Sequence, residues 1–262
     1  MSEGELKFYK CEFIESITLC DVTKIGDSAF ANCSALKSIV LPNGLNKIGQ
    51  AAFYKCCKLT SIVIPDSVTE IGQYAFLCCL NLTSIVLPNS LTKIMGHLFC
   101  NCRNLTEIVI PNSVTEIGIN AFAWCRGLTS ITLPNVLTKI ENGAFKECYN
   151  LTSILIPDSV TEIGPNAFVN CESLASIILP NGLTKIREFT FQGCCSLTTI
   201  VIPDSVTEIG CHAFAFCSAL ISVTLPNGLT KIGTEAFYNC NNLTTLVIPD
   251  SVTEIGYNAF VE

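Results

Sequence analysis

The segment LTSILIPDSVTEIGPNAFVN, residues 151–170, is closed by Cys171 and recurs in related form every 23 residues along the chain. Two kinds of residue keep this spacing without a gap. Phenylalanine stands at Phe30, Phe53, Phe76, Phe99, Phe122, Phe145, Phe168, Phe191, Phe214, Phe237 and Phe260. Cysteine follows at Cys33, Cys56, Cys79, Cys102, Cys125, Cys148, Cys171, Cys194, Cys217 and Cys240. A fixed period in the twenties is typical of solenoids, in which each repeat forms one coil of a stack.

The order of residue types within one repeat predicts the path of a coil. Residues 151–156 alternate in hydrophobicity and are expected to form a β-strand. Residues 157–159, Pro-Asp-Ser, predict a turn, and residues 160–163 predict a short second extended arm. Residues 167–171, Ala-Phe-x-x-Cys, are interpreted as one tight helical turn. The side chains expected to point inward are Leu151, Ile154, Ile156, Val160, Ile163, Ala167, Phe168 and Cys171.

A second period of 46 residues lies over the first. The turn reads LPNGLNKI from Leu41 and IPDSVTEI from Ile64, and this alternation continues to Ile248. It places charges of alternating sign in one column: Lys47, Glu70, Lys93, Glu116, Lys139, Glu162, Lys185, Glu208, Lys231 and Glu254. Because stacked strands lie about 4.8 Å apart, a column of one sign would repel along its whole length. We interpret the alternation as control of register between coils rather than as a binding site.

The composition bounds the fold and excludes some functions. No linker interrupts the repeat, so residues 1–262 are predicted to form a single solenoid domain of about eleven 23-residue coils, between the α/β and mainly β classes. The net charge of −7 argues against nucleic-acid partners. Proline and polar residues punctuate every coil, so no membrane insertion is expected. The first residues show no secretory signal, which favours a cytoplasmic location, with the cell surface as the alternative.

The 17 cysteines are too regularly placed to indicate a disulfide framework. Members of the cysteine column, which Cys11 joins, would have parallel Cβ directions in neighbouring coils, whereas a disulfide needs Cβ atoms about 3.8 Å apart. We therefore expect a column of reduced, buried thiols that pack as small hydrophobic groups. Six cysteines fall outside the column: Cys20, Cys57, Cys78, Cys100, Cys195 and Cys211.

The two ends of the sequence depart from the repeat. Residues 1–10, with Phe8, are expected to form a partial cap, and Cys20-Asp21 replaces the usual turn with one residue fewer. The chain stops at Glu262, before the next cysteine of the column. Uncapped solenoid ends expose core. We expect either a fragment of a longer protein or an end covered by another chain, which would permit end-to-end self-association.

The unit LTSIVIPDSVTEIGQYAFLCC, residues 59–79, resembles the BspA-like, or Treponema-type, leucine-rich repeat, L-x-x-I-x-I-P-x-x-[LV]-x-x-I-G-x-x-A-F-x-x-C. The resemblance covers residues 11–262. It implies a right-handed, curved solenoid with a parallel β-sheet on its concave face. It also implies adhesion or protein binding, often at the surfaces of bacteria and protists, and it brings no catalytic residues.

Two surfaces are candidate binding sites. The first is the outward side of the strands, where a column rich in serine runs beside a column of β-branched and aliphatic residues. Its candidate residues are Ser84, Val86, Glu107, Val109, Ser130 and Thr132. An exposed apolar stripe of this kind suits a protein partner, although strand propensity alone also explains valine and threonine there.

The second candidate surface is the edge beside the phenylalanine column. It carries aromatic residues at Tyr54, Trp124, Phe216 and Tyr238. Aromatic residues are favoured at interface hot spots, and relaxed constraint on solvent-facing turns is the alternative explanation.

No constellation for chemistry stands out. Only two histidines exist and no C-x-x-C pair has zinc-ligand spacing, so we expect no metal, no cofactor and no enzyme activity. The leading hypothesis is a scaffold for protein–protein interaction. The alternative is a cell-surface adhesin that binds host or matrix components and whose leader or anchor is missing from this sequence.

Overall fold

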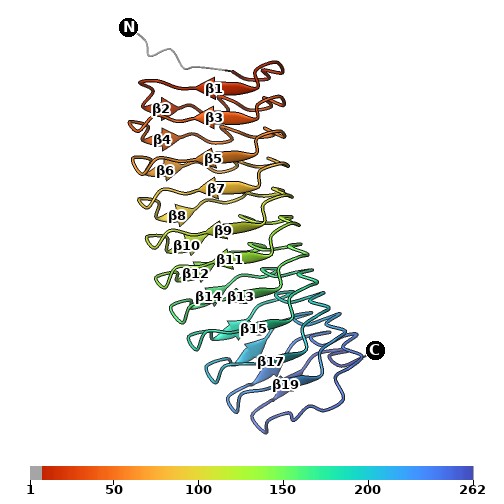
Figure 1. Ribbon diagram of the computed structural model, residues 1–262. Coiled ribbons are helices and arrows are strands. Elements are labelled where there is room, and N and C mark those ends of the chain that lie inside the picture. The colour runs from red at the N-terminus through yellow and green to blue at the C-terminus, as the bar shows by residue number, and fades with distance from the viewer. Residues whose placement is uncertain (1–7, 262) are drawn as a thin grey trace.

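The computed structural model describes residues 8–261, and these form a stack of parallel coils that bends along its length (Figure 1). Each coil except the last described one contributes a three-residue strand and a two-residue strand, and the last one contributes a two-residue strand. The three-residue strands are β1 (Ser16–Thr18), β3 (Ser38–Val40), β5 (Ser61–Val63), β7 (Ser84–Val86), β9 (Glu107–Val109), β11 (Ser130–Thr132), β13 (Ser153–Leu155), β15 (Ser176–Ile178), β17 (Thr199–Val201) and β19 (Ser222–Thr224). The predicted repeat solenoid with parallel strands is confirmed.

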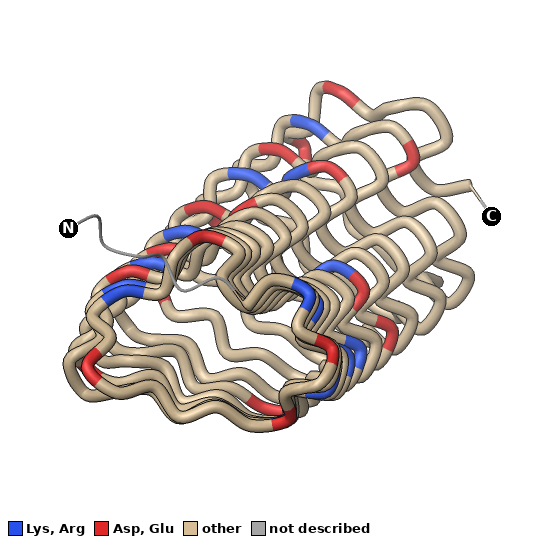
Figure 2. The backbone as a smooth tube through the Cα atoms, turned by 90° about the horizontal axis from the view of Figure 1, so that it is seen from above, with Lys and Arg blue, Asp and Glu red and all other residues tan. Residues whose placement is uncertain are grey.

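The second arm of each coil is a two-residue strand on a neighbouring side of the stack. These strands are β2 (Lys24–Ile25), β4 (Lys47–Ile48), β6 (Glu70–Ile71), β8 (Lys93–Ile94), β10 (Glu116–Ile117), β12 (Lys139–Ile140), β14 (Glu162–Ile163), β16 (Lys185–Ile186), β18 (Glu208–Ile209), β20 (Lys231–Ile232) and β21 (Glu254–Ile255). From β4 onward their first residues are the predicted charge column, which runs along one edge of the stack as alternating blue and red segments (Figure 2), whereas Lys24 of β2 lies beside the like-charged Lys47.

The register confirms the periods read from the sequence. Strand β1 pairs with β3 with an offset of 22 residues, Ser16 opposite Ser38, as the shortened turn at Cys20 predicts. Later pairs have an offset of 23 residues, such as Ser61 opposite Ser84. Beyond β19, an isolated bridge joins Ser222 to Thr245.

The core lies inside the coils. All eight inward positions predicted for residues 151–171 are buried, each with at most 5% of its surface exposed. The phenylalanine rings stack in one continuous column, with Phe122 and Phe145 centroids 5.5 Å apart and their planes within 4°. Phe8 extends the column by stacking on Phe30 at 5.1 Å. Because each ring packs between two neighbours, a coil draws its core from the coils on both sides.

The Ala-Phe-x-x-Cys segment is not a helical turn, and the described part of the chain contains no helix. In one coil the amides of Ala121, Ala123 and Cys125 close turns onto carbonyls three residues back. The alternate amides, those of Asn120, Phe122 and Trp124, donate to the next coil. A helix would direct every amide along its own axis. Bonds between coils therefore replace the local helical bonds that the sequence spacing suggested.

This path needs two left-handed residues in each coil, one before the alanine and one before the cysteine. Asn120 has φ +52° and Trp124 has φ +61°. The glycine of the repeat has another task. A Cβ placed on Gly164 would lie 2.5 Å from the backbone nitrogen of Asn142 in the preceding coil. Glycine is required there by the close approach of two backbones.

The ten column thiols from Cys33 to Cys240 are buried and unbridged, as expected, whereas Cys11 is half-buried. Each of these ten thiols also donates to the carbonyl oxygen of a phenylalanine in the preceding coil, as Cys125 does to Phe99 at 3.0 Å and Cys148 to Phe122 at 3.2 Å. Burial raises the pKa of the Cys171 thiol to about 12. The thiols therefore remain protonated, and each contributes a hydrogen bond between coils as well as packing.

Candidate functional site: the strand face

The outward side of the three-residue strands, which we call the strand face, brings all six predicted residues together. Ser130 lies opposite Glu107 and Thr132 opposite Val109 in the pair β9–β11. Strand β7, with Ser84 and Val86, lies on the other side of β9. The six side chains line a shallow depression of about 530 Å³, together with Asn89 and Pro111.

The strand face carries an exposed apolar stripe along the stack. Val86 is 57% exposed and Val109 is 68% exposed. The other exposed members are Val40, Val63, Leu155, Ile178, Val201 and Val247. Strand propensity can explain why valine occurs in these strands, but it does not explain why the valine side chains are exposed. They point to solvent because the inner side of every strand faces the core.

Charge on the strand face is sparse and acidic. Glu107 is the charged residue among the outward strand positions of β3 to β19. One rim of the face, just after each strand, carries exposed acidic residues at Asp66, Asp158, Asp204 and Asp250. The face thus combines an aliphatic stripe with a negative border.

The aromatic edge is more dispersed than the sequence suggested. Trp124 and Phe216 occupy the same position of the repeat, four coils apart, which is about 19 Å at 4.8 Å for each coil. Tyr54 and Tyr238 share another position and lie eight coils apart. Of these four residues, Phe216 and Tyr238 are in contact, edge to face, with centroids 5.5 Å apart. The four residues therefore do not form one patch.

Around Trp124 the structure shows contacts that the sequence interpretation missed. The Lys146 ammonium lies 5.6 Å from the Trp124 ring centroid. Arg126 lies over the Tyr149 ring at 4.9 Å, and Glu147 accepts a hydrogen bond from the Tyr149 hydroxyl at 2.9 Å. The sequence feature that could have predicted these contacts is the spacing of about 23 residues between each cation and its ring. The charged and aromatic groups around Trp124 therefore already contact one another. Within the described chain, the strand face is the larger surface whose exposed side chains have no such contacts.

Two stacked aromatic–histidine pairs were also missed. Tyr74 stacks on His97 at 4.9 Å, and Phe189 stacks on His212 at 4.8 Å. Burial lowers the pKa of His97. All four residues lie at the left-handed position two residues before the column phenylalanine of their coils, where asparagine and glycine stand in several other repeats.

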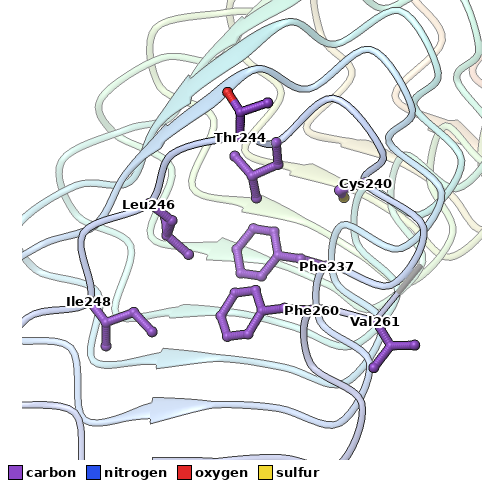
Figure 3. Close-up of a pocket in the computed structure, with 8 residues that line it drawn as sticks. Phe237, Cys240, Thr244, Leu246, Ile248, Phe260 and Val261 are labelled. Atoms are coloured by element: carbon purple, nitrogen blue, oxygen red, sulfur yellow. The ribbon is translucent and has the colours of Figure 1, made fainter.

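A second hollow, of about 290 Å³, lies at the last described coil (Figure 3). The Phe237 and Phe260 rings stack there, and Leu246 and Ile248 point toward the same space. These residues occupy positions that are buried in the preceding coils, so the hollow is core seen from its end, and we assign it no ligand. End-to-end self-association through this hollow stays a prediction.

Within residues 8–261, no helix is present that could cross a lipid bilayer. The same residues place no three histidine, cysteine or acidic side chains where they could hold a metal ion.

Comparison with known proteins places the repeat in a family. The family model described as "BspA type Leucine rich repeat region (6 copies)" matches residues 4–129, 93–220 and 138–262. No curated protein sequence matches the chain.

Solved structures agree with this match. A leucine-rich repeat protein from Bacteroides ovatus is 30% identical, with 95% of this chain and 79% of that chain covered and a TM-score of 0.67. One from Eubacterium ventriosum is 28% identical, with 97% and 78% covered and a TM-score of 0.66. The pneumococcal vaccine antigen PcpA is 23% identical, with 92% and 74% covered and a TM-score of 0.59, a likeness of fold alone.

Proposed function

Because this chain belongs to the BspA-type leucine-rich repeat family, we propose that it is a non-enzymatic scaffold that binds a protein partner on its strand face. The observation that supports this proposal is the continuous exposed aliphatic stripe, which includes Val86 and Val109. Contiguous exposed apolar surface of this kind is typical of protein interaction sites.

The chemistry of the face restricts the partner. Aliphatic side chains of the partner would pack on the stripe, and a lysine or arginine would pair with Glu107 at its centre. The acidic rim at Asp66 and Asp158 favours a partner with a basic border, since complementary charge speeds association and sets orientation. A partner on the adhesin hypothesis would be a host or matrix protein with the same features.

Paired variants test the proposal. The immobilised protein is incubated with an extract of its source cells and, separately, with matrix proteins, and bound proteins are quantified by mass spectrometry. Val86→Asp with Val109→Asp should remove the specific partner, and Glu107→Lys should weaken its capture about tenfold or more, because charge reversal at a desolvated pair costs several kcal/mol.

Trp124→Ala is the matched control on the aromatic edge. It should leave capture unchanged if the partner occupies the strand face. Loss of capture in Trp124→Ala but not in the strand-face variants would move the site to the aromatic edge. Equal capture by all variants would contradict a binding role for either surface. Thermal melting of each variant checks that it remains folded.

A further inference from the structure

The thiols of this protein fall into two groups. The ten column thiols from Cys33 to Cys240 are buried, and each donates to a phenylalanine carbonyl, as Cys79 does to Phe53 at 3.2 Å. Burial raises the pKa of these thiols well above the ordinary value, as at Cys79. Since the thiolate is the reactive form, the column is chemically inert.

Cys57 and Cys78 stand outside the column in two adjacent coils, and the Cys57 side chain is directed toward Cys78. Cys57 follows column residue Cys56, Cys78 precedes column residue Cys79, and both are partly exposed. The Cys57 Sγ lies 3.7 Å from the main-chain oxygen of Cys78, which is 21 residues further along the chain. A spacing two residues short of a full coil thus directs the Cys57 side chain toward Cys78.

This arrangement avoids the obstacle to disulfides within the column. Column cysteines in adjacent coils are equivalent by the repeat, so their Cβ directions run parallel. Cys57 and Cys78 occupy different positions on either side of the column, and the Cys57 side chain extends toward Cys78. The charge of the Cys78 thiol raises the pKa of Cys57, which requires the two sulfurs to lie near each other.

Polar groups lie beside both sulfurs. The Asn101 side-chain amide donates to the Cys78 sulfur at 3.3 Å. Burial and the charge of the neighbouring Cys78 thiol raise the pKa of the Cys57 thiol, and the exposed Lys55 ammonium acts in the opposite direction.

We propose that Cys57 and Cys78 form a redox-sensitive dithiol that hydroperoxides convert to an intramolecular disulfide. The Cys78 thiolate attacks one peroxide oxygen, the O–O bond breaks, and a sulfenic acid and hydroxide form. The Cys57 thiolate then attacks the Cys78 sulfur, which forms the S–S bond and expels a second hydroxide. The two protons lost by the thiols convert both hydroxides to water (for hydrogen peroxide), so two electrons pass from the sulfurs to the peroxide.

The disulfide would close one entire coil, containing β5 and β6, into a loop. Such a bridge restricts the unfolded chain more than the folded one, so it stabilises the fold. Oxidation would then raise the melting temperature of the full-length protein, and reduction would reverse the change. The predicted switch acts on the stack and is independent of any partner on the strand face.

Peptide mapping tests the proposal on the folded full chain. Hydrogen peroxide is added to the native reduced protein, remaining thiols are alkylated, and peptides are identified by mass spectrometry. We expect the loss of two thiols for each chain, a linked peptide joining Cys57 to Cys78, and full recovery with dithiothreitol. Cys57→Ser and Cys78→Ser should each abolish the linkage and the rise in melting temperature.

The chain supplies a matched control at Cys195. This thiol occupies the same repeat position as Cys57, and its Sγ also lies 3.7 Å from a main-chain oxygen 21 residues further on, but that residue is Phe216. Cys195→Ser should leave the linkage unchanged, and Phe216→Cys should create a second linkage to Cys195. Linkage of Cys78 to Cys100, linkage only between chains, or oxidation of Cys57 and Cys78 without a bridge would overturn the proposal.

Discussion

Two kinds of junction alternate along the stack, and they join neighbouring coils through different contacts. We call a coil an isoleucine coil or a leucine coil by the residue before its turn proline, such as Ile64 or Leu87. From an isoleucine coil to the next leucine coil the three-residue strands pair, as β5 does with β7. From a leucine coil to the next isoleucine coil, as between β7 and β9, the described three-residue strands are not paired.

The leucine-to-isoleucine junctions are held on the other side of the coil. There the two-residue strands always pair, as β8 does with β10, and an ion pair joins their first residues. At isoleucine-to-leucine junctions the described two-residue strands pair at β10–β12 and β18–β20 but not at β6–β8 or β14–β16. The ion pairs are Lys47–Glu70, Lys93–Glu116, Lys139–Glu162, Lys185–Glu208 and Lys231–Glu254, at 2.6 to 3.4 Å. At isoleucine-to-leucine junctions within residues 8–261, one ion pair lies beside the two-residue strands, between Arg187 and Glu162 at 3.9 Å.

A serine of each isoleucine coil also holds the same junction. Ser159 Oγ donates to the Leu137 carbonyl of the preceding leucine coil at 2.6 Å, and Ser67 and Ser251 donate likewise. Leucine coils have glycine or valine at this place in four repeats and Ser90 in one. The difference shows why the sequence repeats over 46 residues as well as 23: the two junctions need different side chains.

The largest expected effect comes from the packing that both junctions share. Phe145→Ala should lower the free energy of unfolding by about 3–5 kcal/mol, because its ring is fully buried and its removal leaves a cavity. Phe122→Ala, in an isoleucine coil, should cost about the same, since the column is uniform. Denaturant titration measures both, and an unchanged midpoint in either variant would remove that ring from the core.

A smaller effect is expected at the serine of a leucine-to-isoleucine junction. Ser159→Ala should cost about 1 kcal/mol, because the Leu137 carbonyl loses its side-chain donor. The control is Ser176→Ala, an exposed serine of β15, which should stay within about 0.5 kcal/mol of the parent. Equal effects in the two variants would mean that the serine does not hold the junction.

The smallest effect is expected at one ion pair. Glu208→Gln should cost about 0.2–1 kcal/mol at low salt and nothing measurable at high salt, because the Lys185–Glu208 pair is partly exposed and screened. The hydrogen bond from Lys185 lowers the pKa of Glu208 below its ordinary value of 4.5.

The sign of the pH effect follows from this lowered pKa. The pair contributes stability above the unfolded pKa of the carboxyl, and this contribution is lost as pH falls through the lower folded pKa. Melting curves from pH 6 down to acid should therefore fall less steeply for Glu208→Gln than for the parent. Glu107→Gln, which removes a carboxylate without an ion-pair partner in the described chain, is the control, and an identical slope for the parent and Glu208→Gln would contradict the effect.

Most of the fold could be predicted from the 23-residue repeat. The eight side chains of residues 151–171 that were predicted to point inward are buried. A position of the repeat that is apolar in every coil faces the same side of the stack each time, so the repeat identifies the core. The path of the Ala-Phe-x-x-Cys segment could not be predicted this way. Left-handed Tyr74 and Trp124 are unfavourable locally by about 1–2 kcal/mol each, and only the bonds to neighbouring coils make that conformation stable.

The candidate surfaces were predictable to different degrees. Strand alternation placed Val86, Glu107 and Val109 on the outside, and they are exposed there. The distances between the aromatic residues of the second candidate surface were not predicted, because a shared position in the repeat does not say how many coils separate two residues. The alternation of strand pairing between β5–β7 and β7–β9 also lay beyond the sequence pattern, since it depends on backbone geometry.

Deletion of whole coils tests most directly the claim that the stack is built from two-coil units. Removing residues 84–129 takes out one leucine and one isoleucine coil, so Glu70 meets Lys139 and the alternation continues. Removing residues 84–106 alone places two isoleucine coils together, with Glu70 beside Glu116. The two-coil deletion should melt in one cooperative transition near the parent's midpoint, and the shorter deletion, despite losing fewer residues, should melt at a clearly lower temperature. Equal midpoints for the two deletions, or loss of cooperative melting in the two-coil deletion, would contradict the account.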